Sequence, residues 1–203
     1  MLKIKNISAK YENETVISDL SYEFEKGKAY AIIGPSGIGK TTLLNIMCGL
    51  KSPDIGKVET DFSRPAYVFQ DARLFPWLTA LDNVTLVCDN KQKAEKTLIS
   101  LLGDPDSLST YPPELSGGMK QRVSIARALC YDGDILFLDE PFRGLDPETK
   151  HNISSFLFEA SRDKTVIMIT HDVNDAKLCD VILKMNGSPV TALTEESGNF
   201  KTE

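Results

Sequence analysis

A glycine-rich segment that ends in a lysine and a threonine is the first feature of the sequence that could do chemistry. Residues 34–41 read Gly-Pro-Ser-Gly-Ile-Gly-Lys-Thr and fit the pattern GxxxxGK[ST]. Glycines let backbone N–H groups converge on phosphate oxygens, the lysine adds a positive charge, and the threonine hydroxyl can bind Mg²⁺. The spacing predicts a nucleotide-phosphate site, with a plain strand–loop–helix corner as the alternative. The candidate binding residues are Gly34, Pro35, Ser36, Gly37, Ile38, Gly39, Lys40, Thr41 and Thr42, of which Thr41 is also a candidate metal ligand.

Two acidic residues follow a short apolar run. Residues 135–138 are Ile-Leu-Phe-Leu, and Asp139 and Glu140 come directly after them. Carboxylates at the end of a buried strand are costly unless a cation lies beside them. Asp139 could hold Mg²⁺, and Glu140 could act as the general base that polarises an attacking water. Taken alone, the pair is as compatible with a strand that ends in solvent; beside a phosphate loop, it favours a metal and catalytic site.

A serine and two glycines form a second candidate anion site. Ser116, Gly117 and Gly118 precede residues 119–129, which have the composition of a helix. The N-terminus of a helix attracts anions, yet one nucleotide does not need two such sites in one subunit. The functional interpretation is a head-to-tail dimer in which each subunit completes the other's nucleotide site. The structural alternative is a capped helix with a flexible entry.

His171 follows another predicted buried strand, at residues 166–170. A histidine at the end of a strand is more often a surface residue or a satisfied core residue than a ligand. The alternative is a polar contact to the γ-phosphate from the same edge of the sheet.

The elements that must position these residues alternate between strands and helices. Short, wholly apolar runs predict strands that are covered on both faces, and the alternation predicts a mostly parallel α/β sheet. A closing hairpin is expected at residues 181–184 and 189–192, and a loop with its own short hairpin at 51–63. The expected strands are 2–8, 15–24, 29–33, 66–69, 135–138 and 166–170, and the expected helices are 40–50, 94–102, 119–129 and 148–161.

Composition and charge exclude several classes of protein. The chain has 203 residues, with 23 basic and 29 acidic side chains, a net charge of −6 and a pI near 5.1. This balance argues against nucleic acid as a partner. The four cysteines form no CxxC pair, so a structural zinc cluster is not expected. No apolar run approaches the roughly 18 residues of a membrane span, and no signal core follows Met1. We therefore expect a cytosolic chain.

With these motifs in view, the chain resembles the nucleotide-binding subunits of ABC transporters over almost its full length. Residues 115–122, Leu-Ser-Gly-Gly-Met-Lys-Gln-Arg, are similar to the LSGGQ-type signature of that family. The other motifs occur in the family's order: Walker A at 34–41, the Q-loop glutamine Gln70, Walker B at 135–140, the D-loop aspartate Asp146 and the switch histidine His171.

The resemblance implies a single domain over residues 1–203. Residues 1–70 and 114–203 would form a P-loop NTPase core of the RecA type, with an N-terminal antiparallel β part. Residues 71–113, where prolines are frequent and β-branched residues few, would form an inserted α-helical lobe.

The resemblance also implies a role for each matched residue. Gln70 would contact Mg²⁺ and water, and Ser116–Gly118 would cap the γ-phosphate of ATP bound to the opposite subunit. Asp146 would lie at the dimer seam and help to order the water, and His171 would hold the γ-phosphate. Tyr11 is in the place of the aromatic residue that stacks on adenine; from the sequence alone it could equally be a strand core residue.

The implied ligands and partners follow from the family. They are ATP and Mg²⁺, a second copy or a paralogous ATPase subunit, a membrane permease, and an extracytoplasmic solute-binding protein. The chain would lie on the cytoplasmic face of the membrane as a peripheral subunit. Residues 68–84 are similar to those of nitrate, sulfonate and taurine importers, which favours import of a small solute. The apolar run 74–78, which contains Trp77, would either fill the core of the lobe or contact the permease.

Two departures from the family pattern concern the D-loop and the signature. Arg143 and Gly144 replace the Ser-Ala that many importers have, and Met119 replaces the commonest glutamine. Two other functions compete with transport. A non-transport ABC-type ATPase, of the DNA-repair or translation kind, usually carries long insertions or two ATPase units. A small-metabolite kinase would have no use for the signature segment.

Overall fold

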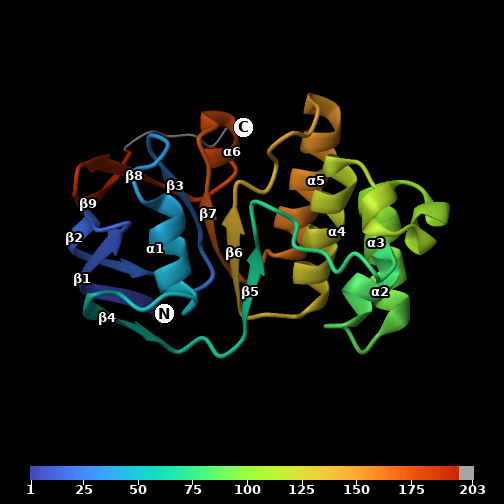
Figure 1. Ribbon diagram of the computed structural model, residues 1–203, viewed down its shortest axis with the longest axis horizontal. Coiled ribbons are helices and arrows are strands. Elements are labelled where there is room, and N and C mark those ends of the chain that lie inside the picture. Colours follow the sequence, from blue (N-terminus) through green and yellow to red (C-terminus); the bar gives the residue numbers. More distant parts are fainter. Residues whose placement is uncertain (197–203) are drawn as a thin grey trace.

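A single mixed β-sheet runs through the molecule (Figure 1). The computed structural model describes residues 1–196, and within them nine strands follow the order β4-β1-β2-β9-β8-β3-β7-β6-β5. The strands are β1 (Leu2–Tyr11), β2 (Glu14–Phe24), β3 (Ala29–Ile33), β4 (Ile55–Thr60), β5 (Pro65–Val68), β6 (Ile135–Asp139), β7 (Thr165–Ile169), β8 (Val181–Gly187) and β9 (Val190–Glu195). The predicted α/β fold with a mostly parallel core is confirmed.

The parallel half of the sheet contains β8, β3, β7, β6 and β5. Every residue of β6 and β7 is buried, as expected for strands covered on both faces. Successive side chains on a strand point to opposite faces, so these two strands supply two cores. Ile135 and Phe137 pack with α1 (Lys40–Met47) and the N-terminal strands, whereas Leu136 and Leu138 pack against the helices of the other face.

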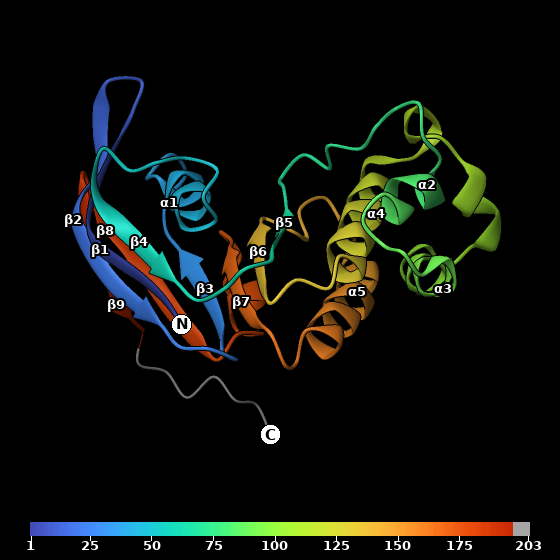
Figure 2. The same cartoon turned by 90° about the horizontal axis from the view of Figure 1, so that it is seen from below.

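Figure 2 shows the sheet curling around α1 at one end of the molecule, while α2, α3 and α4 form a separate arm at the other end. The helix α4 packs against α2 and α3, and also contacts α5. Prolines at positions 105, 112 and 113 lie in two short 3₁₀ segments of this arm. The remaining helices are α2 (Ala80–Thr85), α3 (Lys91–Leu102), α4 (Gly117–Cys130), α5 (Pro147–Ala160) and α6 (Val173–Ala176), and the 3₁₀ segments are η1 (Pro105–Ser109) and η2 (Pro112–Glu114).

The structure corrects the expectation for residues 51–63. They form no hairpin of their own; instead β4 pairs antiparallel with β1, so the N-terminal β part has β4 at its edge. The preceding helix is also shorter than expected, because Gly49 adopts a left-handed φ of 80° and ends the helical path after Met47. The hairpin of β8 and β9 is confirmed.

The apolar run 74–78 divides between two environments. Leu74 packs against the core, whereas Trp77 is 69% exposed and Phe75 is also exposed. The buried Asn83 of α2 holds this loop, since its Oδ1 accepts from the Phe75 N–H at 2.8 Å and its Nδ2 donates to three loop carbonyls. Within residues 1–196, no helix has both the length and the apolarity needed to cross a bilayer.

Candidate nucleotide-binding and hydrolysis site

The phosphate loop connects β3 to α1 and leaves the first turn of that helix open. Gly39 precedes the helix with a left-handed φ of 107°, and no side chain caps the first N–H groups. These N–H groups and the helix dipole favour an anion at this position. The loop is closed from behind by β8: a Cβ at Gly34 would lie 2.8 Å from the carbonyl oxygen of Met185, so only glycine fits there.

Lys40 is buried and turned back onto the loop. Its Nζ donates to the carbonyl oxygens of Gly34 and Pro35, at 2.7 and 2.9 Å. Burial lowers the pKa of the amine, although the charges of Glu140 and Asp139 act in the opposite direction. A phosphate would give this poorly solvated ammonium a charged partner.

Asp139 ends β6 as a buried carboxylate with an unused acceptor. Within the described residues its Oδ1 has no hydrogen-bond partner. Burial raises the pKa of the carboxyl to about 6, while a hydrogen bond from the Thr41 side chain acts to lower it. An orphaned carboxylate oxygen, a hydroxyl and the Gln70 amide are the hard oxygen donors that Mg²⁺ prefers, so these residues fit the ion.

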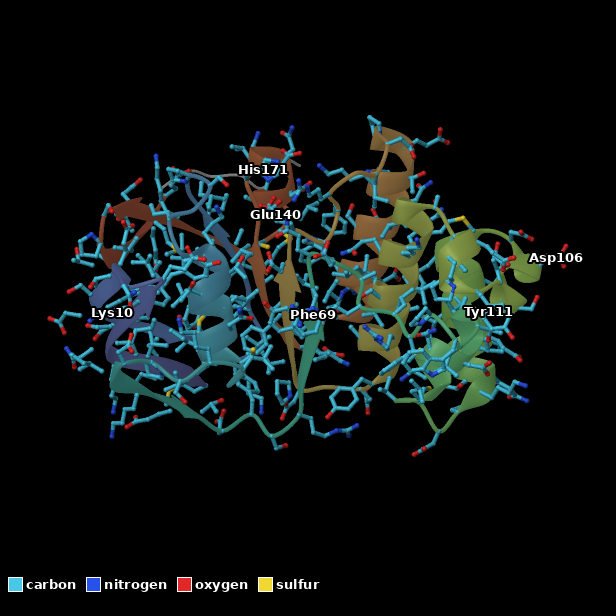
Figure 3. The ribbon with its side chains drawn as sticks, in the orientation of Figure 1. Lys10, Phe69, Asp106, Tyr111, Glu140 and His171 are labelled. Atoms are coloured by element: carbon cyan, nitrogen blue, oxygen red, sulfur yellow. The ribbon has the colours of Figure 1, made fainter. Side chains whose placement is uncertain are left out.

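Glu140 and His171 meet at the carboxyl edge of the sheet, as the sequence predicts for groups that follow neighbouring parallel strands. Asp139 of β6 pairs with Ile169 of β7, and the Glu140 N–H donates to the Ile169 carbonyl at 3.0 Å. Glu140 adopts a left-handed φ of 50°, which is unusual for a residue with a side chain. Its Oε2 lies 2.7 Å from Nδ1 of His171, and Figure 3 shows the two side chains together at this edge.

Eight of the eighteen predicted site residues line one cavity of about 450 Å³. Its wall contains residues from four motifs: the phosphate loop, the Q-loop, the acidic strand end and the switch histidine. Sequence reasoning did not assign Arg143 to this wall. The sequence signal that could have indicated it is the short separation of three residues between Arg143 and Glu140. In the structure, the Arg143 N–H donates to the Glu140 carbonyl at 3.2 Å and closes a turn. The lining residues are Ser36, Gly37, Lys40, Thr41, Gln70, Asp139, Glu140, Arg143, Ile169 and His171.

A second cavity, of about 420 Å³, adjoins the phosphate loop on the side of the N-terminal strands. Tyr11 lines it and is 58% exposed, so the alternative of a core tyrosine is wrong. The cavity shares Gly37, Lys40 and Thr41 with the first. Sequence reasoning missed Val16, Asn45 and Lys51 in its wall, because no motif marks them. The complete lining is Tyr11, Val16, Gly37, Gly39, Lys40, Thr41, Thr42, Asn45 and Lys51.

The signature segment and the D-loop aspartate line neither cavity. Ser116 caps α4, and its Oγ accepts from the Met119 N–H at 3.2 Å. Asp146 caps α5 and accepts from the Thr149 N–H at 3.0 Å, which lowers its pKa. The helices α1 and α4 lie on opposite sides of β6, with both N-termini toward the upper edge of Figure 1. A single subunit therefore presents two separate helix N-termini in one direction.

Comparison with known proteins places the chain among ATP-binding subunits of transporters. The family model described as ABC transporter matches residues 17–143. The bicarbonate transport ATP-binding protein CmpD of Synechocystis sp. is 40% identical, over 93% of this chain and 75% of the relative. The aliphatic sulfonates import protein SsuB 1 of Rhodococcus jostii is 37% identical, over 94% and 81%. The taurine import protein TauB of Pseudomonas aeruginosa is 38% identical, over 88% and 74%.

A solved structure shares the fold. The ATP-binding cassette MJ0796, in a dimeric post-hydrolysis state bound to ADP and Pi, superposes with a TM-score of 0.86 and 30% identity, over 97% of this chain and 98% of that one. The structural likeness covers nearly the whole chain, whereas the family model covers the phosphate loop, the signature segment and the acidic strand end. The chain therefore belongs to the ABC transporter family of ATP-binding subunits.

Proposed function

We propose that this chain binds ATP with Mg²⁺, hydrolyses it at the cavity of the phosphate loop, and thereby powers a membrane permease that imports a small solute. The observation that carries the proposal is the contact between Glu140 and His171, at 2.7 Å, in the wall of the cavity that also holds Lys40 and Asp139. The residues that we propose as base, γ-phosphate contact, phosphate-binding cation and metal ligand thus line one cavity.

The nucleotide would extend over both cavities. Its phosphates would accept hydrogen bonds from the first turn of α1 and from Lys40, and its base would stack on the exposed ring of Tyr11. Thr41, Gln70 and Asp139 would hold Mg²⁺, which supplies charge neutralisation at the β- and γ-phosphates.

Glu140 would act on the attacking water. Its carboxylate is little exposed and the histidine contacts one of its oxygens, Oε2, so Oε1 would be the oxygen that accepts a proton from water. His171 would give up part of its contact with Glu140 to contact the γ-phosphate. The exposure of the His171 side chain, 66%, supports this role, because an exposed imidazole can reach a bound ligand.

A second subunit would complete the site. Ser116, Gly117 and Gly118 lie at a helix N-terminus outside the cavity of their own subunit, and Asp146 lies at another. A two-fold dimer could bring each signature segment onto the partner's ATP. The dimeric state of the related cassette supports this arrangement.

The permease would dock beside Gln70. A groove of about 300 Å³ between β5 and the helical arm is lined by Phe69, Phe75, Leu86, Val87 and Tyr131, among others. Trp77 is exposed, and its ring centroid lies 5.4 Å from that of Phe75 in the wall of the groove, on the loop that Asn83 holds. Aromatic side chains of this kind are frequent anchors of interfaces. A permease helix in the groove would move with Gln70 and so respond to the nucleotide.

The named relatives serve bicarbonate, sulfonate and taurine transport, which supports a small anionic or zwitterionic solute as the cargo. A solute-binding protein outside the membrane would deliver it, and the ATPase would lie on the cytoplasmic face. Phosphate release from ATP by the purified chain, measured with Mg²⁺ and with excess EDTA, tests the hydrolytic part. If Mg²⁺ causes no phosphate release, either from the chain alone or from the chain with its permease, the proposal is overturned.

A further inference from the structure

Lys150 joins the beginning of α5 to the segment that follows β7. Its Nζ lies 2.5 Å from Oδ2 of Asp172 and 2.6 Å from Oδ1 of Asp175. The lysine side chain is only 24% exposed and Asp175 is buried, so water screens these ion pairs less than it screens pairs at the surface.

The α5 end of this bridge is fixed to the D-loop. Lys150 is one helical turn beyond Asp146, and its backbone N–H donates to the Asp146 carbonyl at 2.9 Å. The Asp146 side chain closes the same turn by accepting from Thr149. Lys150 therefore moves together with Asp146.

The other end of the bridge is fixed to both neighbours of His171. Asp172, the next residue, also accepts from the Asn174 N–H at 2.8 Å, and its own N–H donates to Oγ1 of Thr170 at 3.0 Å. Oδ2 of Asp175 lies 3.5 Å from the same hydroxyl. The backbone on either side of His171 thus belongs to one polar network that Lys150 enters from α5.

Charge explains why this network needs the lysine. Burial raises the pKa of Asp175 and the lysine opposes that shift, while hydrogen bonding to Lys150 lowers the pKa of Asp172. Without the Lys150 ammonium, the carboxylates of Asp172 and Asp175 would repel each other in the segment that follows His171.

We propose that Lys150 is a positioning residue for hydrolysis: it holds the His171 segment against the start of α5, so that His171 stays beside Glu140 and moves with the D-loop. This role rests on the proposed function, in which Glu140 and His171 act on ATP. Lys150 does not line either cavity, so it would act through the chain segments and not on the nucleotide.

The test compares two lysines of similar exposure. Lys164 is 20% exposed and pairs with Asp132 at 3.7 Å, but it precedes β7, at the end of that strand opposite His171. Lys150→Met, Lys150→Arg and Lys164→Met would be assayed for ATPase kcat and KM, with thermal unfolding measured for each. We expect Lys150→Met to lower kcat about 10- to 100-fold with KM for ATP within about 2-fold of wild type, because His171 is displaced while the phosphate loop is untouched.

Lys150→Arg should restore kcat to within about 3-fold of wild type, because a guanidinium can bridge the same two carboxylates. Lys164→Met should leave kcat unchanged even if it lowers the unfolding temperature. The proposal is overturned if kcat falls equally in the two methionine variants, if KM rises in parallel, or if arginine does not restore kcat.

If Lys150→Met does not fold, Lys150→Gln, which keeps a donor for Asp175, is judged by the same criteria. Absence of ATPase in the wild type would instead refute the proposed function itself.

Discussion

His171 and Glu140 are in contact although their exposures differ widely: Nδ1 of the histidine lies 2.7 Å from Oε2 of the glutamate, with side chains 66% and 14% exposed. The strand pairing of β6 and β7 places both residues one step beyond buried strands, at the same edge. The contact with His171 therefore orients the Glu140 carboxylate at the wall of the cavity. We propose that this orientation suits Glu140 as the general base for an attacking water.

Glu140→Gln tests the base. Glutamine keeps the size of the side chain and its contact with His171, but it cannot accept a proton from water. The turnover of ATP should fall by roughly 10²- to 10⁴-fold, while ATP affinity survives because Lys40 and the loop amides are unchanged. Size-exclusion chromatography with ATP should show accumulation of a dimer. Turnover equal to wild type would remove Glu140 from the mechanism.

Asp139→Asn tests the buried carboxylate without metal or nucleotide. The folded-state pKa of about 6 lies above the ordinary value of 3.8, so ionisation opposes folding. At about pH 3 the carboxyl is largely protonated in both states and the substitution should change little; above about pH 6 the asparagine variant should be more stable, by roughly 1–3 kcal/mol. Urea unfolding in EDTA at about pH 3 and about pH 7.5 measures this difference. An asparagine variant that is less stable at pH 7.5 would show that Asp139 is a structural residue.

Tyr11→Ala tests the stacking contact. Because the ring is exposed, its removal should not change the unfolding temperature, but KM for ATP should rise about 10-fold, as loss of one aromatic stack predicts. Tyr11→Phe is the matched control and should behave as wild type. An unchanged KM in the alanine variant would place the base elsewhere.

Trp77→Ala tests the permease surface. The side chain is exposed, so the variant should stay folded and bind ATP, yet it should co-purify less with the permease from membranes. Leu50→Ala removes an exposed apolar side chain outside the groove and should co-purify normally. Undiminished co-purification of the Trp77 variant, or its unfolding, would contradict the anchor role.

The sequence predicts the centre of this fold better than its edges. Residues 135–138 and 166–169 are apolar without interruption, and such runs are typical of strands covered on both faces. The pairing of β4 with β1 could not be predicted in this way, since β4 contains Gly56 and two charged residues and is defined by its partner more than 45 residues earlier. The four-residue α6 is too short to leave a periodic signal.

The site shows the same division. Motifs identify Lys40, Asp139 and Glu140, because glycine-rich loops and acidic strand ends have a chemical signature of their own. The position of Tyr11 in a cavity wall, and the ion pairs of Lys150, depend on contacts between distant segments. A lysine on a helix is usually a solvated residue, so its spacing alone indicates nothing about His171.

We propose that ATP is hydrolysed at a site shared between two subunits. Ser116→Arg should block hydrolysis but leave ATP binding to dilute monomer nearly intact, because the phosphate loop of that chain is unchanged. Lys40→Ala should block hydrolysis by weakening phosphate binding. Neither variant should hydrolyse ATP alone.

Mixing the two variants is the most direct measurement. In a mixed dimer, one site combines the intact phosphate loop of the Ser116→Arg chain with the intact signature of the Lys40→Ala chain. Random pairing makes half of the dimers mixed, each with one of two sites restored, so the mixture should regain about a quarter of wild-type ATPase activity. A mixture as inactive as its two components, although mixed dimers form, would contradict the shared site, as would loss of ATP binding in dilute Ser116→Arg monomer.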